Sequence, residues 1–337
     1  MKRFGNLYSQ VVNYENLILA THKALRGKKA KAKVASFYFN FENEVIQLEQ
    51  ELNDGTYYPS SYHLFEIREP KVRQICSSDF RDRVVHHAIC NIIEPFFERR
   101  LIFDTYACRN EKGAHAALKR AQQFSRSHRY FLKCDIRKYF QSIDHPVLKH
   151  MLRGIVKDSK LINLLDLIID HAVPGNAPGK GIPIGNLTSQ HFANFYLGEL
   201  DHFLKERSRL KGYVRYMDDF ICFSDSKNFL HDLLATIREF VEQKLKLRLK
   251  DEIIRIAPVS EGVPFLGFRV FPNLIRLQRP NLIRFRKKIR NLERHFQIGL
   301  ISESDLASSV KSMIAHITHA NSGMMRRKEF ESSLNLA

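Results

Sequence analysis

The chain has 337 residues, of which 44% are hydrophobic and 27% charged, a composition typical of a folded globular protein. Its 54 Lys and Arg residues against 36 Asp and Glu residues leave a formal net charge of +18. This excess predicts a polyanionic partner such as a nucleic acid, because basic side chains that neutralise its phosphates release the bound counterions. The alternative is a basic surface that only keeps the protein soluble. The sequence shows neither a membrane-spanning apolar run, a signal-peptide core, nor a Cys-x-x-Cys pair, so we expect a cytoplasmic protein without a membrane partner.

The first part of the chain is predicted to be mainly helical. Residues 41–53 carry apolar side chains at helical spacing and stop at an Asp-Gly turn signal. Further helices are predicted over 79–98, where apolar residues form a stripe, and over 114–126. The basic stretch 23–33 predicts either a phosphate contact or a solvated helix face or loop.

From residue 129 onward, strands are predicted among the helices. In chain order we expect a strand over 129–136, a helical segment over 146–172, a Gly- and Pro-rich loop over 174–185, a helix over 186–201, strands over 213–216 and 220–224, a helix over 227–245, strands near 247–257 and 264–271, and a basic helical tail. This mixed order, with the strands gathered in the middle of the chain, predicts an α+β fold.

Two adjacent aspartates, Asp218 and Asp219, lie between strand-like segments in YVRYMDDFICFS (213–224). Adjacent carboxylates repel each other, and a buried pair is unfavourable unless a cation neutralises it. Neighbours in an extended strand point to opposite faces of the sheet. We therefore predict a tight turn at Met217-Asp218 that brings both carboxylates near the tip of a β-hairpin.

A third carboxylate, Asp135, ends the apolar strand in FLKCDIRKYFQSIDH (131–145). Its alternative role is the N-cap of a following helix, and we interpret Asp144 as a turn or cap residue. Three aspartates from two strand ends can hold two divalent ions, which is the arrangement that in-line phosphoryl transfer needs. Mg²⁺ is the expected ion because it prefers carboxylate and phosphate oxygens, with Asp135 and Asp218 as the essential pair.

The order of four motifs resembles that of reverse transcriptases. The motifs are the strand ending in Asp135 with Phe140 five residues later, the loop GIPIGNLTSQ (181–190), YMDD (216–219) and FLGF (265–268), and the resemblance runs from about Lys71 to Phe268. It implies a right-hand polymerase fold with an antiparallel palm sheet and a helical thumb. The implied boundaries are 1–63 for an N-terminal extension and the start of the fingers, 64–128 for the fingers, 129–146 for the palm, 147–180 for a connection, 181–272 for the palm with active-site hairpin and primer grip, and 273–337 for the thumb.

The resemblance also implies roles for single residues. Asp135, Asp218 and Asp219 match the catalytic aspartates, which hold two Mg²⁺ ions together with the backbone carbonyl of Ile136. Phe140 matches an aromatic gate against the ribose 2′-hydroxyl. The residues implied in nucleotide binding are Lys71, Arg73, Arg109, Phe140, Ile184, Gly185 and Gln190; those in the primer grip are Phe265, Leu266, Gly267 and Phe268; those facing nucleic-acid phosphates are Arg284, Arg286, Lys287, Lys288 and Arg290. Core packing of Phe140 and surface pairing of the cations are the alternatives.

The loop before the acidic pair indicates which subgroup of reverse transcriptases the chain resembles. Ile184-Gly185 and Ser189-Gln190 stand where most bacterial relatives carry Gln-Gly and Ser-Pro, and the loop and HITHANS (316–322) are similar to reverse transcriptases of diversity-generating retroelements. An isoleucine offers only shape where a glutamine hydrogen-bonds, so we expect weaker discrimination between right and wrong nucleotides. The resemblance to this group implies that the errors are concentrated at template adenines.

The partners implied are template RNA, an RNA or DNA primer, dNTPs, and a basic accessory RNA-binding protein or a noncoding RNA. Three alternatives remain at this point. The first is an antiphage-defence reverse transcriptase acting with its own noncoding RNA, the second an inert RNA-binding scaffold, and the third a two-metal nuclease.

Overall fold

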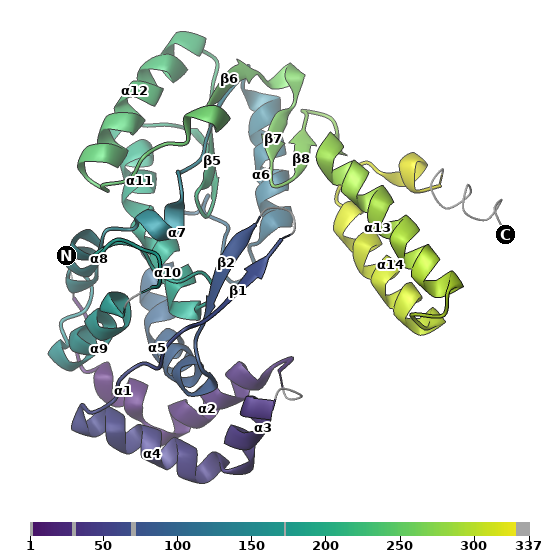
Figure 1. Cartoon of the computed structure of the whole chain (residues 1–337). Helices are drawn as coiled ribbons and strands as arrows, with labels where there is room; N and C mark the ends of the chain where they lie inside the picture. The colour runs from purple at the N-terminus through teal and green to yellow at the C-terminus, as the bar shows by residue number, and fades with distance from the viewer. Residues whose placement is uncertain (1–2, 29–31, 69–71, 172, 328–337) are drawn as a thin grey trace. The chain divides into compact units, whose positions relative to one another are not determined.

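The computed structural model describes residues 3–28, 32–68, 72–171 and 173–327 (Figure 1). The chain divides into two compact units that alternate along the sequence. One comprises Met1–Phe103, Ile136–Arg207 and Thr236–Lys250; the other comprises Asp104–Asp135, Ser208–Ala235 and Asp251–Ala337. Helices dominate the first unit and the second contains the larger sheets, so the predicted α+β class is confirmed. None of the helices in the described ranges is long and apolar enough to cross a membrane.

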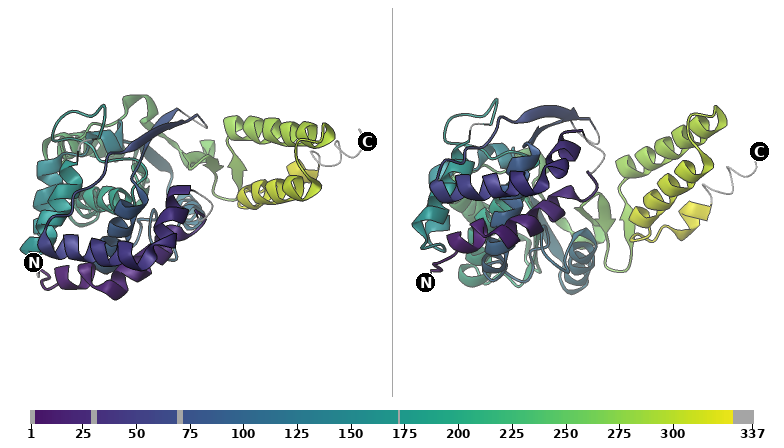
Figure 2. Two further views of the ribbon diagram at one scale, coloured as in Figure 1. Left: turned by 60° about the horizontal axis from the view of Figure 1, so that its bottom comes forward. Right: turned by 90° about the horizontal axis from the view of Figure 1, so that it is seen from below.

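The helical unit is built around α5 (Phe80–Glu98), whose predicted apolar stripe is completely buried at Val84, Val85, Ala88 and Ile89. Helices α1, α2 and α3 pack against α5 and lie together with α4 as a layer, purple in Figures 1 and 2. The other elements of this unit are α1 (Tyr8–Val12), α2 (Tyr14–Leu25), α3 (Ala32–Phe39), α4 (Phe41–Asp54), the hairpin strands β1 (His63–Ile67) and β2 (Arg73–Ser77), α7 (Tyr139–Ser142), α8 (His145–Arg153), α9 (Ser159–Asp170), α10 (Leu187–Tyr196), α11 (Gly198–His202) and a π-helical turn, Phe203–Arg207.

Of three helical segments predicted in this unit, one forms a single helix and two are each divided into two helices. The helix over 41–53 is confirmed, and it ends at Gly55 in the left-handed conformation (φ 72°) that glycine tolerates best. The predicted helical segment 146–172 is confirmed and consists of two helices, because α8 stops at Gly154 and a new N-cap, Asp158, starts α9. The segment 186–201 is likewise divided into α10 and α11.

The sheet unit contains a four-stranded antiparallel sheet in the order β4-β5-β3-β6. Its strands are β3 (Tyr130–Cys134), β4 (Gly212–Tyr216), β5 (Asp219–Ser224) and β6 (Arg255–Pro258). The predicted helix over 114–126 is α6 (Ala114–Ser127), which packs against β4, and α12 (Lys227–Gln243) follows β5. The core between α6 and the sheet includes Ala117, Ala121, Phe131 and Ile221.

A second antiparallel sheet, β7 (Val263–Phe265), β8 (Phe268–Val270) and β9 (Ile275–Leu277), completes this unit with α13 (Arg279–Gln297) and α14 (Glu303–Ile317). The strand predicted near 264–271 is therefore a hairpin. The strand predicted near 247–257 begins only at Arg255, because a 3₁₀ turn precedes it. Helices α13 and α14 lie side by side in every view, joined by Phe285, Ile289 and Ile317 (Figures 1 and 2).

Candidate functional site

The acidic pair lies on the β4–β5 hairpin, as predicted. Tyr216 pairs with Asp219 across the two strands, so Met217 and Asp218 alone form the turn. Met217 has a φ of 57°, which is the positive value that a tight two-residue hairpin turn requires. Asp218 is half-buried in the turn and Asp219 is the first residue of β5.

Arg215 supports this turn from inside the protein. Its side chain is fully buried, and its Nη1 donates a hydrogen bond to the carbonyl oxygen of Met217 at 2.9 Å. The backbone of Arg215 also bonds to the segment before α6: its N–H donates to the carbonyl of Asp104 at 3.0 Å, and the Tyr106 N–H donates to its carbonyl at 3.0 Å. The turn is thus fixed by a guanidinium and by a neighbouring backbone segment.

Asp135 follows β3, the strand beside β5. Cys134 pairs with Phe220, and one further step of this antiparallel register brings Asp135 opposite Asp219. Asp135 is half-buried, and it is not a helix N-cap, since α7 begins after Lys138. The cap expected at Asp144 is confirmed, because its Oδ1 accepts the Val147 N–H at 3.1 Å.

Two protein groups already hold the carboxylate of Asp219. The ammonium of Lys133 forms an ion pair with it, and the backbone N–H of Leu266 donates a hydrogen bond to it. Burial raises the pKa of Asp219, Lys133 lowers it in part, and the nearby negative charge of Asp135 raises it again. The negative charge of Asp135 therefore acts directly on the carboxylate of Asp219.

The primer-grip sequence FLGF forms the β7–β8 hairpin. Its turn residues Leu266 and Gly267 have φ values of 48° and 84°, and the flanking Phe265 and Phe268 pair with each other and are each 1% exposed. The carbonyl of Gly267 accepts hydrogen bonds from the side chain of Asn281 at 2.7 Å and from the N–H of Gln278 at 3.1 Å. The start of α13 is thereby tied to this turn.

In the helical unit, the loop before α10 is held by backbone hydrogen bonds on both sides. The Ile182 N–H donates to the carbonyl of Phe140 at 2.8 Å, and the Cys76 N–H donates to the carbonyl of Ile184 at 2.9 Å. Gly185 leaves no room for a side chain, since a Cβ there would lie 2.9 Å from the Cys76 carbonyl oxygen. Phe140, Ile184 and Gln190 are half-buried.

The basic residues expected to bind the nucleotide do not all lie in the same part of the chain. Arg73 is the exposed first residue of β2, and Lys71 lies outside the described residues. Arg109 belongs to the sheet unit, where its Nη1 donates to the carbonyl of Thr105 at 2.9 Å. The role of each of these residues in nucleotide binding is therefore a prediction from the sequence.

A buried hydrogen-bond network fixes the start of α10. The Asn186 side chain accepts from the Ser78 hydroxyl at 2.7 Å and places its amide nitrogen 3.3 Å from Nε2 of His86. An amide nitrogen only donates, so Nε2 carries the lone pair and Nδ1–H donates to Thr188 Oγ1 at 2.8 Å. Burial, aided by nearby positive charges, lowers the pKa of His86 to about 3. The imidazole is thus held neutral.

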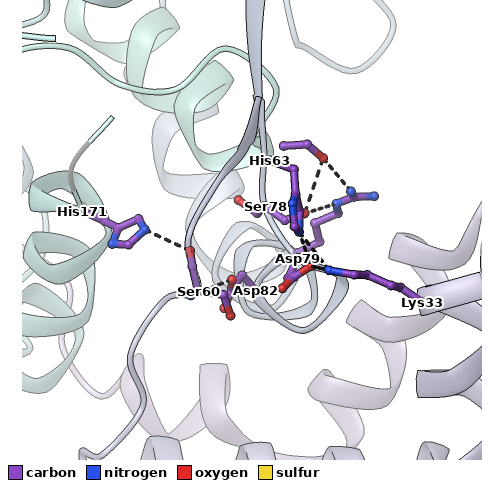
Figure 3. Close-up of polar contacts among 9 residues, drawn as sticks. Lys33, Ser60, His63, Ser78, Asp79, Asp82 and His171 are labelled. Atoms are coloured by element: carbon purple, nitrogen blue, oxygen red, sulfur yellow. Dashed lines mark hydrogen bonds and ion pairs between the residues drawn. The ribbon is translucent and has the colours of Figure 1, made fainter. Parts of the chain in front are cut away.

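A second network anchors the β1–β2 hairpin to the start of α5 (Figure 3). Asp79 Oδ1 contacts His63 Nε2 at 2.9 Å and Lys33 Nζ at 3.2 Å. Asp82 accepts the Ser60 N–H at 3.0 Å, and His171 contacts the Ser60 carbonyl at 3.0 Å. These bonds fix the end of the hairpin where His63 pairs with Ser77, and Arg73 lies at its other end, paired with Ile67.

The cations expected to face phosphates lie on α13. Phe285 and Ile289 point inward and are buried. Four of the five predicted cations are exposed and Arg286 is half-buried; the exposed ones are Arg284, Lys287, Lys288 and Arg290. The helix therefore presents a basic face opposite an apolar one.

The donor set of the acidic cluster suits a hard divalent cation. Asp135 and Asp219 repel each other and Asp218 lies next in the chain, whereas Lys133 supplies a single positive charge. Carboxylate oxygens are the ligands that such ions prefer. Within the described ranges, no three His, Cys, Asp or Glu side chains are placed to hold a metal together.

Two residues of this site, Lys133 and Arg215, were not predicted from the sequence. Each is a cation inside an otherwise apolar strand. That pattern could have signalled a buried partner, because a buried charge is retained only when it is paired. The sequence does not reveal which partner it finds.

Comparison with known proteins gives a consistent result. The sequence profile of the family described as "Reverse transcriptase (RNA-dependent DNA polymerase)" matches residues 67–270. The group II intron-encoded protein LtrA of Lactococcus lactis is 24% identical over 74% of this chain and 52% of its own length. Protein YkfC of Escherichia coli is 27% identical over 67% of this chain and 71% of its own. Apo telomerase from Candida tropicalis is 13% identical, with a TM-score of 0.49 over 69% of this chain and 52% of its own.

The profile covers more than half of the 337 residues. The chain itself spans about half the length of LtrA, at 52%.

Proposed function

Because the chain belongs to the reverse transcriptase family, we propose that it is an RNA-directed DNA polymerase that extends an RNA or DNA primer on a template RNA with dNTPs. The observation that carries this proposal is the placement of Asp135 opposite Asp219 beside the β-hairpin turn that holds Asp218. The family uses divalent metal ions, and the carboxylates here suit them. The neighbouring FLGF hairpin, bonded to Asp219 through Leu266, supports a primer seat beside this cluster.

Two Mg²⁺ ions would be held by Asp135, Asp218 and the carbonyl of Ile136, with Asp219 beside them. Bound there, such ions activate a primer hydroxyl and stabilise the charge of the transferred phosphoryl group. Arg73 would bind the triphosphate, and the ring of Phe140 would exclude a ribose 2′-hydroxyl. The segments 64–128, 129–146 with 181–272, and 273–337 would act as fingers, palm and thumb of a cytoplasmic enzyme.

The test is primer extension by the purified full chain on a defined RNA template. Asp218→Asn keeps the size of the side chain and removes its charge, so we expect incorporation to fall by about two orders of magnitude or more. Asp54→Asn, at an exposed position at the end of α4, serves as the charge-matched control and should retain activity. Unchanged incorporation by Asp218→Asn would contradict the proposal, and template cleavage without incorporation would favour a two-metal nuclease.

The finer proposal is copying with errors concentrated at template adenines, as in a diversity-generating retroelement. It is supported by Ile184, whose backbone is fixed to Cys76 while its side chain offers no hydrogen bond to a base pair. The loop IGNLTSQ differs here from the pattern of most bacterial relatives. Loss of polar readout weakens discrimination between right and wrong nucleotides.

Sequencing of cDNA made from an RNA with equal base content checks this finer proposal. We expect misincorporation opposite adenine to exceed that opposite the other bases, and Ile184→Gln to reduce that excess several-fold while incorporation persists. Equal error frequencies at all four bases would exclude adenine mutagenesis and favour the antiphage alternative. Sequencing of co-purifying RNA then identifies either a retroelement template or a dedicated noncoding RNA, and co-purifying protein reveals any basic accessory partner.

A further inference from the structure

The buried ammonium of Lys133 contacts both hairpins of the site. It forms the ion pair with Asp219 of the β4–β5 hairpin and lies 5.2 Å from the ring centroid of Phe265 in the β7–β8 hairpin. Its side chain is only 7% exposed. A lysine is seldom buried in a sheet, and it remains charged there only when an anion compensates it.

Asp219 has a second partner. The N–H of Leu266 donates to its carboxylate, and Leu266 lies in the β7–β8 turn with a positive φ of 48°. The carboxylate therefore has a cation and an amide as partners, both supplied by the sheet unit. These two donors occupy about half of the roughly four lone-pair sites of the carboxylate, and Lys133 also neutralises its charge.

We propose that Lys133 is a permanent internal counter-ion that holds Asp219 out of the metal ligand set, leaving Asp135 and Asp218 as the metal-binding carboxylates. Lys133 is thus a positioning residue: it acts through Asp219 and fixes the YMDD hairpin to the FLGF hairpin. This inference rests on the proposed function, because it assigns a divalent-metal site to the same cluster. The alternative is that Asp219 releases Lys133 and ligates the metal.

Charge balance separates the two arrangements. With Lys133 and Asp219 paired, their charges cancel, and a neutral pair at these positions should leave the metal site almost unchanged. Lys133→Met alone leaves an extra anion, whereas Asp219→Asn alone leaves an extra cation. One unit charge close to a divalent ion changes the affinity of the site for that ion strongly. We therefore expect Lys133→Met to tighten metal binding and Asp219→Asn to weaken it, each by about tenfold or more.

The experiment is titration of the full chain with Mn²⁺, with free Mn²⁺ read by electron paramagnetic resonance and no nucleotide or nucleic acid present. The decisive protein is the double variant Lys133→Met/Asp219→Asn, which also avoids any unpaired buried charge and so folds even if Lys133→Met does not. Lys227→Met, at an exposed position on α12, is the control and should bind Mn²⁺ as the parent chain does.

A dissociation constant of the double variant within about threefold of the parent value supports the counter-ion role, since a missing ligand would weaken binding further. A value weakened by about tenfold or more overturns it and places Asp219 in the ligand set. Unchanged affinity in Lys133→Met would also overturn it. Because the titration requires no polymerisation, a failed primer-extension assay contradicts the proposed function without affecting this result.

Discussion

At the scale of single residues, two buried cations organise the acidic cluster. Lys133 is 6% exposed and Arg215 is fully buried, although both lie in strands whose neighbours are apolar. Each is compensated in a different way, Lys133 by the carboxylate of Asp219 and Arg215 in part by the carbonyl of Met217. Removing one partner of such a buried pair leaves the other without hydration, so these positions tolerate substitution poorly.

The substitution Arg215→Met tests the support of the turn. It preserves apolar bulk but leaves the Met217 carbonyl without its buried donor, so we expect the free energy of unfolding to fall by about 1–3 kcal/mol and the incorporation rate to drop with it. Urea unfolding and primer extension provide the two measurements. Lys227→Met is the matched surface control, and equal stability in the two variants would show that Arg215 does not support the turn.

At the scale of elements, the structure joins the FLGF hairpin to α13. Gln278 and Asn281, at the start of the helix, both bond to the carbonyl of Gly267. At the far end of the tail, Asn321 and Ile275 exchange two hydrogen bonds of 2.8 Å. The pair of helices α13 and α14 is therefore attached to the second sheet at both of its ends. These hydrogen bonds fix the position of the basic face of α13 relative to that sheet.

Neutralising the exposed cations of α13 should weaken nucleic-acid binding uniformly across sequences. For the triple variant Lys287→Gln/Lys288→Gln/Arg290→Gln we expect the slope of log K against log salt to decrease in magnitude by about 2–3, at about 0.9 per lost phosphate contact. Binding of a primed RNA duplex at several salt concentrations gives this slope. The control replaces three exposed lysines elsewhere, Lys119, Lys157 and Lys227, and a control slope reduced equally would show that the α13 face has no special role.

At the scale of the whole molecule, charge and burial make the chain sensitive to acid. The net charge of +18 grows as histidines and carboxylates take up protons, and His86 is buried where a positive charge is unfavourable. Its pKa of about 3 in the folded chain lies well below the ordinary histidine value of 6.5. Between pH 6.5 and about 3, His86 therefore binds a proton in the unfolded chain but not in the folded chain.

The sign of this linkage predicts lower stability in acid. Above pH 6.5, His86 is neutral in both states and does not lower the free energy of unfolding. As the pH falls from 6.5 toward 3, only the unfolded chain takes up the proton, and the free energy of unfolding decreases by about 1.4 kcal/mol per pH unit. Urea unfolding at pH 7.0, 6.0 and 5.0 should show this loss, and His86→Gln should flatten it even though the variant starts less stable. His22→Gln, at an exposed position, should keep the parent slope; a parent slope in His86→Gln would mean that another group titrates.

Much of the fold was predictable because local patterns agree with it. The apolar stripe of α5, the α4 stop at Gly55 and the turn at Met217-Asp218 follow from side-chain period and from turn chemistry, and all three are confirmed. The helical segment predicted over 146–172 is confirmed, but its division into two helices was not predicted, because hydrophobic spacing alone does not reveal the cap at Asp158 that starts α9. The early strand over 247–257 was wrong because a 3₁₀ turn intervenes.

The sequence by itself determined the family, the α+β class and the motif order, because these depend on residue types at fixed spacings. Its roles for single residues, such as Phe140 and Ile184, remain predictions. Only the tertiary structure decided that Lys133 and the Leu266 N–H meet the carboxylate of Asp219, and that Arg215 holds the turn. Lys133 and Leu266 are each separated from Asp219 by tens of residues, so only the pairing of distant strands and hairpins brings these three together. Arg215 and Met217 are two residues apart, but their hydrogen bond depends on the burial of the Arg215 side chain in the folded protein.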